Sequence, residues 1–205
     1  MLRIIAESAE IVDEPSPATP EPAPDPAIVR TIALVGLMGA GKSAIGKRLA
    51  QRLGLPFVDA DIEIEAAAGC TIEEFFERFG EAEFRAGERR VIQRLLDGPP
   101  HVLATGGGAF MDPQTRAVMR EKATTIWLRA ELGVLLERVA RRSNRPLLKN
   151  GDPRGTLERL MAVRYPIYAE ADIVVDSRDA PADRTAEDVH TALMRHLGVA
   201  TGDAT

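Results

Sequence analysis

The sequence predicts an α/β fold in which a parallel sheet is flanked by helices. From Val29 onward, short apolar runs alternate with stretches in which apolar residues recur at helical spacing, as expected of strands joined by crossover helices. In addition, a glycine-rich segment of phosphate-binding type stands between the first apolar run and the first helical stretch. Strand, loop and helix in that order place this segment at the edge of the sheet.

Five strands are expected, each ending where polar or glycine residues begin. Their predicted ranges are Thr31–Val35, Pro56–Asp59, Val102–Thr105, Thr124–Leu128 and Ile173–Val175. Helices are expected over residues 44–53, about 81–96 and 157–171. Residue pairs typical of helix starts are Thr71 with Glu74, Asp112 with Pro113, and Thr185 with Asp188. Ligands of such sheets bind at the carboxyl ends of the strands.

Composition limits the chain to one globular domain. With 205 residues, 45% hydrophobic and 28% charged, the chain can bury a sizeable core but has no room for a second catalytic domain. A net charge of −5 and the lack of a long basic run argue against a nucleic-acid partner, so we expect small-molecule partners and a monomer. A single cysteine, Cys70, excludes an internal disulfide.

The N-terminal residues resemble neither a membrane span nor a targeting signal. No stretch reaches the roughly 18 to 20 apolar residues that a membrane helix needs, and several acidic residues follow Arg3, so a cytoplasmic location without a membrane partner is expected. Six prolines between Pro15 and Pro26 predict a disordered extension over residues 1–28. The folded domain is expected over 29–198, with a disordered tail over 199–205. A docking helix over residues 1–12 is the alternative for the extension.

Residues 36–43 read G-L-M-G-A-G-K-S, a complete phosphate loop of the form G-x-x-x-x-G-K-[ST]. Its glycines let backbone N–H groups converge on a phosphate, and the following helix N-terminus adds positive potential. In such a loop Lys42 reaches the β- and γ-phosphates, while the Ser43 hydroxyl ligates Mg²⁺. The motif predicts that a nucleoside triphosphate with magnesium is bound; a plain glycine-rich turn is the alternative.

Two carboxylates, Asp59 and Asp61, end the second predicted strand. Residues two apart on an extended segment point the same way, so both could face a crevice above the phosphate loop. One would serve the magnesium ion and the other would orient an alcohol for in-line attack. The alternative is that Asp61 only caps a helix beginning near Ile62.

Three further segments have a composition that suits ligand binding. The run Gly106-Gly107-Gly108 follows the third strand and would let a ligand approach the backbone, although a flexible turn is the alternative. Arg85 and Arg164 lie on two predicted helices, and if they converge they favour an acidic substrate, because a guanidinium matches a carboxylate bidentately. Residues 141–153 form a basic segment bounded by Pro and Gly, which is typical of a lid but also of an exposed loop.

Taken in order, six motifs closely resemble those of the shikimate kinase family. They are G-L-M-G-A-G-K-S at 36–43, D-A-D at 59–61, E-F-R at 83–85, G-G-G-A at 106–109, R-P-L-L at 145–148 and R-Y-P-I-Y at 164–168. The resemblance covers about Val29 to Leu197. It implies a P-loop NTPase fold of the nucleoside monophosphate kinase type, with a five-stranded parallel sheet, a lid and substrate-binding helices. It also implies that ATP phosphorylates the 3-hydroxyl of shikimate with Mg²⁺ as cofactor.

The resemblance also implies a role for each matching position. Catalytic roles would fall to Lys42, Asp61 and Arg145, the last of these in the lid. ATP would be bound by Gly39, Ala40, Gly41, Lys42, Ser43, Ala44 and Arg145, with Arg138 and Arg178 as adenine contacts by looser alignment. Shikimate would be bound by Asp61, Arg85, Gly106, Gly107, Gly108 and Arg164, and Mg²⁺ by Ser43 and Asp59.

Two rival functions stay open from the sequence. A related kinase for another polyol acid, such as gluconate, would share the phosphate loop, but the glycine run and the paired arginines argue against it. A non-catalytic shikimate or nucleotide sensor would share the fold, but Lys42, Ser43, Asp59, Asp61 and Arg145 are all intact and no DNA-binding segment is appended.

Overall fold

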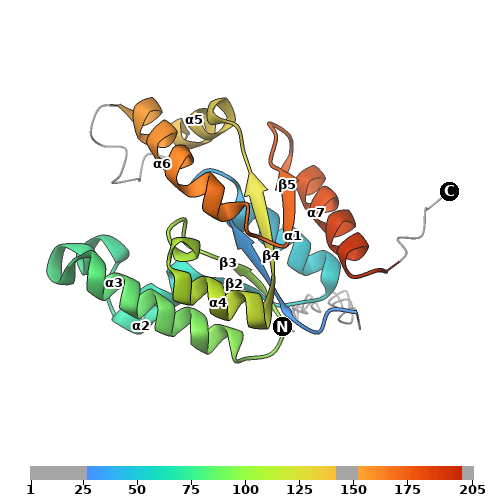
Figure 1. Cartoon of the computed structure of the whole chain (residues 1–205), viewed down its shortest axis with the longest axis horizontal. Coiled ribbons are helices and arrows are strands. Elements are labelled where there is room, and N and C mark those ends of the chain that lie inside the picture. Colours follow the sequence, from blue (N-terminus) through green and yellow to red (C-terminus); the bar gives the residue numbers. More distant parts are fainter. Residues whose placement is uncertain (1–26, 142–151, 200–205) are drawn as a thin grey trace, which may run out of the picture.

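The computed structural model describes residues 27–141 and 152–199, and within them a five-stranded parallel sheet has helices on both faces (Figure 1). The strand order is β2-β3-β1-β4-β5, and all four neighbouring pairs are parallel, as predicted. The strands are β1 (Thr31–Val35), β2 (Phe57–Asp59), β3 (Val102–Ala104), β4 (Ala123–Arg129) and β5 (Ile173–Asp176). Each bound lies within one residue of its prediction.

Strand β1 lies at the centre of the sheet, and all five of its residues are buried. It pairs with β3, where Leu34 lies opposite Ala104, and with β4, where Val35 lies opposite Trp127. A strand covered on both faces requires a continuous apolar run rather than an alternating pattern, which is what residues 31–35 provide. The phosphate loop leaves the carboxyl end of this strand and so begins at the middle of the sheet edge.

Seven α-helices and one 3₁₀ turn are described. They are α1 (Lys42–Leu53), α2 (Ala60–Ala68), α3 (Ile72–Leu96), η1 (Ala109–Met111), α4 (Pro113–Lys122), α5 (Leu132–Ala140), α6 (Pro153–Tyr168) and α7 (Ala182–His196). Helices α1 and α7 pack together on one face, while α3 and α4 pack on the other (Figure 1). Helices α5 and α6 contact each other near the carboxyl end of β4. No helix in the described ranges has the length and apolar character that a membrane span requires.

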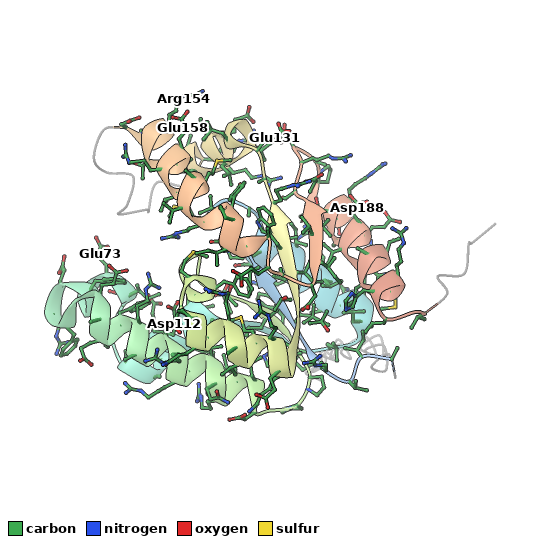
Figure 2. All side chains as sticks on the ribbon, viewed as in Figure 1. Glu73, Asp112, Glu131, Arg154, Glu158 and Asp188 are labelled. Atoms are coloured by element: carbon green, nitrogen blue, oxygen red, sulfur yellow. The ribbon has the colours of Figure 1, made fainter. Side chains whose placement is uncertain are left out.

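Two predicted helix starts are confirmed by their caps. The Thr71 side chain accepts from the backbone N–H of Glu74 at 3.2 Å, and the Glu74 carboxylate accepts from the Thr71 N–H at 2.8 Å. This reciprocal pair satisfies two donors that the first turn of α3 would otherwise leave unpaired. At α4 the Asp112 carboxylate (labelled in Figure 2) accepts from the backbone N–H of Thr115, the third helical residue, at 2.8 Å, with Pro113 at the first helical position.

The third predicted helix start, at Thr185 and Asp188, is wrong. Helix α7 begins at Ala182 directly after Pro181, whose fixed backbone angle leads the chain into the helix four residues earlier than a cap at Thr185 would. Thr185 is only 2% exposed and belongs to the packed face of α7 instead of its cap. Helix α6 is likewise displaced from the predicted 157–171, because Asp152 caps it and Pro153 occupies its first position.

Helix α3 is broken at Gly80, where φ is 78° and ψ is 176°. A positive φ strains residues that carry a Cβ, so glycine suits this position. The predicted helix beginning near Glu81 is therefore the second part of α3, and the capped segment from Ile72 is the first. The break folds the first part back, so that the Phe76 ring stacks on the Phe84 ring with their centroids 4.4 Å apart.

Candidate active site

The phosphate loop turns through three glycines with positive φ, at 138° for Gly36, 83° for Gly39 and 95° for Gly41. A side chain at Gly36 would also collide, since its Cβ would lie 2.7 Å from the Leu128 carbonyl oxygen. Gly41 is the N-cap of α1, so the loop ends at a helix N-terminus, where unpaired N–H groups favour an anion. The backbone at the predicted ATP-binding positions 39–44 thus has the geometry of a phosphate cradle.

The Lys42 ammonium lies inside the curve of this loop. It donates to the carbonyl oxygens of Gly36 at 2.7 Å and Leu37 at 3.0 Å. The four-carbon stem of lysine is flexible, so this ammonium can exchange partners within the loop.

The two predicted metal ligands are brought together. The Ser43 hydroxyl donates to Asp59 Oδ2 at 2.7 Å, and Asp59 Oδ1 accepts from the backbone N–H of Asp61 at 3.2 Å. A hydroxyl and a carboxylate beside a phosphate loop fit Mg²⁺, which binds few protein oxygens and otherwise takes phosphate oxygens and water. The donor set here is therefore compatible with that ion.

The two carboxylates of the D-x-D motif do not point the same way, as the sequence had suggested. Helix α2 begins at Ala60, so Asp61 stands in the first helical turn and Asp59, not Asp61, caps the helix. Side chains two apart diverge on a helix, whereas they align on a strand. Asp59 turns to Ser43, while Asp61 Oδ1 would lie only 2.9 Å from a Cβ on Gly106. One carboxylate thus faces the phosphate loop and the other the glycine run.

Side chains from three helices crowd the glycine run, most closely at Gly106 and Gly108. A Cβ on Gly106 would lie 2.9 Å from the Asp61 carboxylate and 3.0 Å from that of Glu88. A Cβ on Gly108 would lie 2.5 Å from Nη1 of the Arg85 guanidinium. The Cβ position of Gly107 has Arg164 Nη1 and the Met38 amide nitrogen of the phosphate loop as neighbours, each at 3.6 Å. The run is therefore where α2, α3, α6 and the phosphate loop meet, rather than a flexible turn.

Arg85 is oriented by two carboxylates on its own helix. Its Nη1 donates to Glu88 Oε2 at 2.6 Å and its Nη2 donates to Glu81 Oε1 at 3.3 Å. Burial raises the pKa of Glu88, which is only 3% exposed, although the charge of Arg85 opposes that rise. Burial by itself lowers the pKa of Arg85, but the hydrogen bonds and charges of Glu88 and Glu81 outweigh it, so the net shift is upward. The guanidinium stays charged.

Arg164 reaches the same run from α6. Its Nη1 donates to the Gly107 carbonyl at 2.9 Å, and the buried Tyr168 hydroxyl donates to the same oxygen. Burial raises the pKa of Tyr168 to about 12, so the phenol stays a neutral donor at physiological pH. The structure therefore brings Arg85 and Arg164, from two different helices, to the neighbouring residues Gly108 and Gly107.

Arg138 lies against the back of the phosphate loop. Its Nη1 donates to Ser177 Oγ at 2.8 Å and to the Gly39 carbonyl at 3.3 Å, and its Nη2 donates to the Arg178 carbonyl. The Ser177 hydroxyl in turn donates to the Ala40 carbonyl at 2.8 Å. Burial lowers the pKa of Arg138. Of the two predicted adenine contacts, Arg138 thus braces the loop, while the Arg178 side chain is exposed and only its carbonyl takes part. Arg145 and most of the predicted lid lie outside the described residues.

Comparison with known proteins identifies the family. The family model described as shikimate kinase matches residues 38–194. A shikimate kinase of Paramagnetospirillum magneticum is 61% identical over 170 residues, covering 83% of this chain and 87% of that protein. The chain belongs to the shikimate kinase family. A second relative of the same name, from Bradyrhizobium diazoefficiens, is 59% identical over 82% of this chain and 81% of its own.

Solved structures of shikimate kinases have the same architecture. The enzyme of Acinetobacter baumannii, in complex with shikimate, superposes with a TM-score of 0.78 at 36% identity, covering 82% of this chain and 94% of that one. The enzyme of Aquifex aeolicus gives 0.68 at 31% identity, with coverages of 80% and 96%. A gluconokinase of Sinorhizobium meliloti gives 0.56 at 20% identity, which shows a common fold alone.

In this member of the shikimate kinase family, three residues that organise the site were not predicted from the sequence. Glu88 stands three positions after Arg85 on one helix, and this spacing could have revealed it as a partner. Tyr168 belongs to a motif that was noticed, yet its hydroxyl was given no role. Ser177 directly follows β5, at the edge where ligand contacts gather, but no local signal links it to Ala40, which lies 137 residues earlier.

Proposed function

We propose that this protein transfers the γ-phosphoryl group of ATP to the 3-hydroxyl of shikimate, releasing ADP and shikimate 3-phosphate. The observation that carries the proposal is the meeting of Arg85, Arg164 and Asp61 at one glycine run beside the phosphate loop. Shikimate offers one carboxylate and several ring hydroxyls, and these groups match two guanidinium groups and one carboxylate. Membership of the shikimate kinase family supports the same assignment.

Substrate binding is proposed to divide between the arginines and the glycine run. Arg85 and Arg164 each keep N–H donors beyond those engaged within the protein, and these would clamp the shikimate carboxylate. Gly106, Gly107 and Gly108 would approach the ring hydroxyls, since side chains are absent there. Asp61 would hydrogen-bond the reacting hydroxyl, orient it in line with the γ-phosphate and accept its proton.

Phosphoryl transfer is proposed to depend on positioning and charge. Lys42 would bind the β- and γ-phosphate oxygens, with the backbone N–H groups of residues 39–44 around them. Ser43 and Asp59 would hold Mg²⁺, whose charge offsets that of the phosphates. Arg145 would approach the transferring group from the lid, and Arg138 and Arg178 would border the adenine. The chain is proposed to act in the cytoplasm as a monomer, without a nucleic-acid or membrane partner.

The test is ADP release by the purified full chain, measured with a coupled assay in the presence and absence of shikimate at saturating Mg²⁺ and ATP. ADP release should depend on shikimate and stop when EDTA removes the metal. The same assay with gluconate in place of shikimate distinguishes this function from that of a gluconate-type kinase. Binding of shikimate without ADP release would favour the sensor, and faster release with gluconate would refute the proposed substrate.

A further inference from the structure

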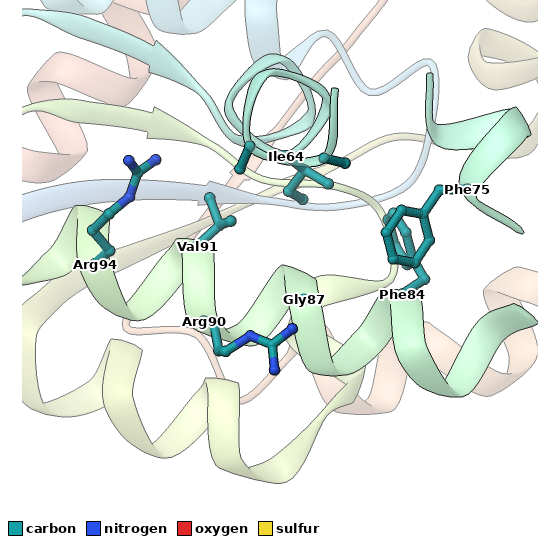
Figure 3. A pocket seen from close by; sticks show the side chains of 9 residues that line it. Ile64, Phe75, Phe84, Gly87, Arg90, Val91 and Arg94 are labelled. Carbon is teal, nitrogen blue, oxygen red and sulfur yellow. The ribbon is translucent and has the colours of Figure 1, made fainter. Parts of the chain in front are cut away.

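A pocket of about 350 Å³ opens between helices α2 and α3, away from the glycine run (Figure 3). Its wall is mostly apolar, and Figure 3 shows Ile64 of α2 facing Val91 of α3, with the rings of Phe75 and Phe84 at one end. Two arginines, Arg90 and Arg94, complete the lining. Pockets that bind small molecules in proteins start at about this volume and combine apolar walls with a few polar groups.

The pocket is separate from the proposed shikimate site. Arg85 and Glu88, which serve that site, lie on the face of α3 next to the one that lines the pocket, and neither belongs to the pocket lining. The two sites adjoin at Phe84, whose ring has the Arg85 guanidinium carbon 5.2 Å from its centroid. A ligand in the pocket would therefore contact the apolar side of α3, not its catalytic side.

Gly87 keeps the pocket open. It lies inside α3, where glycine is among the least favourable residues, and a Cβ built on it would meet no atom within 4 Å. Any larger residue at this position would project into the space between the helices without a clash. A side chain at this position would therefore take up part of the pocket volume.

Arg90 places a positive charge at the pocket. Its side chain is exposed, and within residues 27–141 and 152–199 its guanidinium has no hydrogen-bond, ion-pair or ring partner. Arg94, by contrast, donates to Glu63 at 2.8 Å, so its charge is already matched. In a chain of net charge −5, an unmatched guanidinium on the rim of an apolar pocket is complementary to an anion with an apolar body.

We propose that this pocket binds a small carboxylic acid that carries an apolar ring. The ring would fill the space over Gly87, between Ile64 and the rings of Phe75 and Phe84, where aromatic pairs gain from edge and offset contacts. The carboxylate would lie at the rim on the guanidinium of Arg90. This site is additional to the proposed shikimate site and does not depend on the identity of the phosphoryl acceptor.

The experiment is calorimetric titration of the full chain with 2-naphthoate as probe and 2-naphthalenemethanol as its neutral counterpart. Saturable 1:1 binding of 2-naphthoate is expected. Arg90→Gln should weaken the carboxylate by about tenfold and leave the alcohol unchanged, because only the charged contact is removed. Gly87→Leu should abolish binding of both. Gly133→Leu, at a helical glycine of α5 that is equally open, and Arg184→Gln on α7 are the matched controls and should bind the probe like the native chain.

Amide chemical shifts, measured by NMR on the native chain, show where the probe binds without the use of any variant. The shifts that 2-naphthoate induces should centre on Ile64, Gly87 and Val91. The proposal is overturned if no saturable binding occurs, if Gly87→Leu folds and binds the probe unchanged, or if the shifts centre on Gly106 to Gly108, which would mean that the probe only occupies the arginine clamp.

Discussion

The guanidinium of Arg164 donates to the carbonyl oxygen of Gly107 at 2.9 Å, which joins helix α6 to the third residue after β3. The Tyr168 hydroxyl donates to the same oxygen one helical turn later, so this carbonyl is doubly occupied by the protein. Arg164 is therefore held in place before any substrate arrives. Pre-alignment of this kind lowers the entropic cost of binding.

Replacing Arg85 or Arg164 with Ala should weaken shikimate binding while ATP affinity stays nearly constant. A lost charge-assisted pair leaves the substrate carboxylate poorly compensated, at a cost of about 2 to 5 kcal/mol, or about 30-fold or more in the dissociation constant. Titration with each ligand separately measures both affinities. Arg89→Ala removes an arginine of α3 that pairs with Asp112 instead, and it should leave shikimate affinity unchanged. Equal losses for shikimate and ATP would contradict the clamp.

Arg145→Ala should lower turnover much more than it weakens shikimate binding. A lid arginine that touches the transferring group mainly in the transition state contributes to kcat, with losses on the order of 10³-fold for comparable arginines. Steady-state kinetics separate kcat from KM. If this variant raised only the KM for shikimate while Arg85→Ala lowered only kcat, the division between lid and clamp would be wrong.

Lys42→Ala should reduce phosphoryl transfer at least about a hundredfold, since it removes a charge that stabilises the transition state. The melting temperature should change little, because the ammonium contacts loop carbonyls and not the core. Lys47→Ala on the same helix is the matched control, as its exposed ammonium lies over the Phe57 ring and not in the loop. Turnover close to that of the native chain would refute the role of Lys42.

Glu88 predicts a pH dependence of stability with a definite sign. Burial raises its pKa above the 4.5 of an ordinary glutamate, so the folded chain keeps this proton to higher pH than the unfolded chain does. The contribution of Glu88 to stability is thus complete below pH 4.5 and declines as pH rises through the folded pKa. As pH rises through that window, the melting temperature of Glu88→Gln should increase relative to that of the native chain. Glu83→Gln, at an exposed position of α3, should show no such trend, and parallel curves for Glu88→Gln would exclude the shift.

Deleting residues 1–26 should leave the melting temperature and the turnover nearly unchanged. The proline-rich composition offers too little apolar area to compensate for the entropy of ordering this segment against the domain. Differential scanning calorimetry and the ADP assay on the truncated chain check this. A fall of several degrees, or a clear loss of activity, would show that the extension docks on the domain.

The parts of the fold that local patterns determine were predictable. The strand run Thr31–Val35, the phosphate loop after it and the capping box at Thr71 each depend on residues within a few positions of one another, and all three are confirmed. The start of α7 was not predictable, because Pro181, one turn earlier, begins the helix in place of an equally plausible cap at Thr185. Two nearby residues can each favour a helix start, and the sequence alone does not show which of the two starts is used.

The site was predictable as a set of residues but not as a geometry. Motif chemistry indicated Asp59 and Asp61, yet their opposite directions depend on where β2 ends and α2 begins, a boundary that differs from the expected one by two residues. Arg85 and Arg164 are 79 positions apart, so their arrival at neighbouring glycines is a property of the sheet order. Glu88 was not predicted, because an acidic residue on a helix with many charges is usually a surface residue.

The hydrogen bond from Ser177 to the Ala40 carbonyl spans 137 positions of the chain. The eight-residue phosphate motif ends at Ser43, but the side chains that contact its back come from much later in the chain. They are Arg138 of α5 and Ser177, which directly follows β5. During synthesis the motif leaves the ribosome long before its support exists. We therefore expect chains that end before Ser177 to bind nucleotide more weakly than the full chain, because the phosphate loop would lack this support.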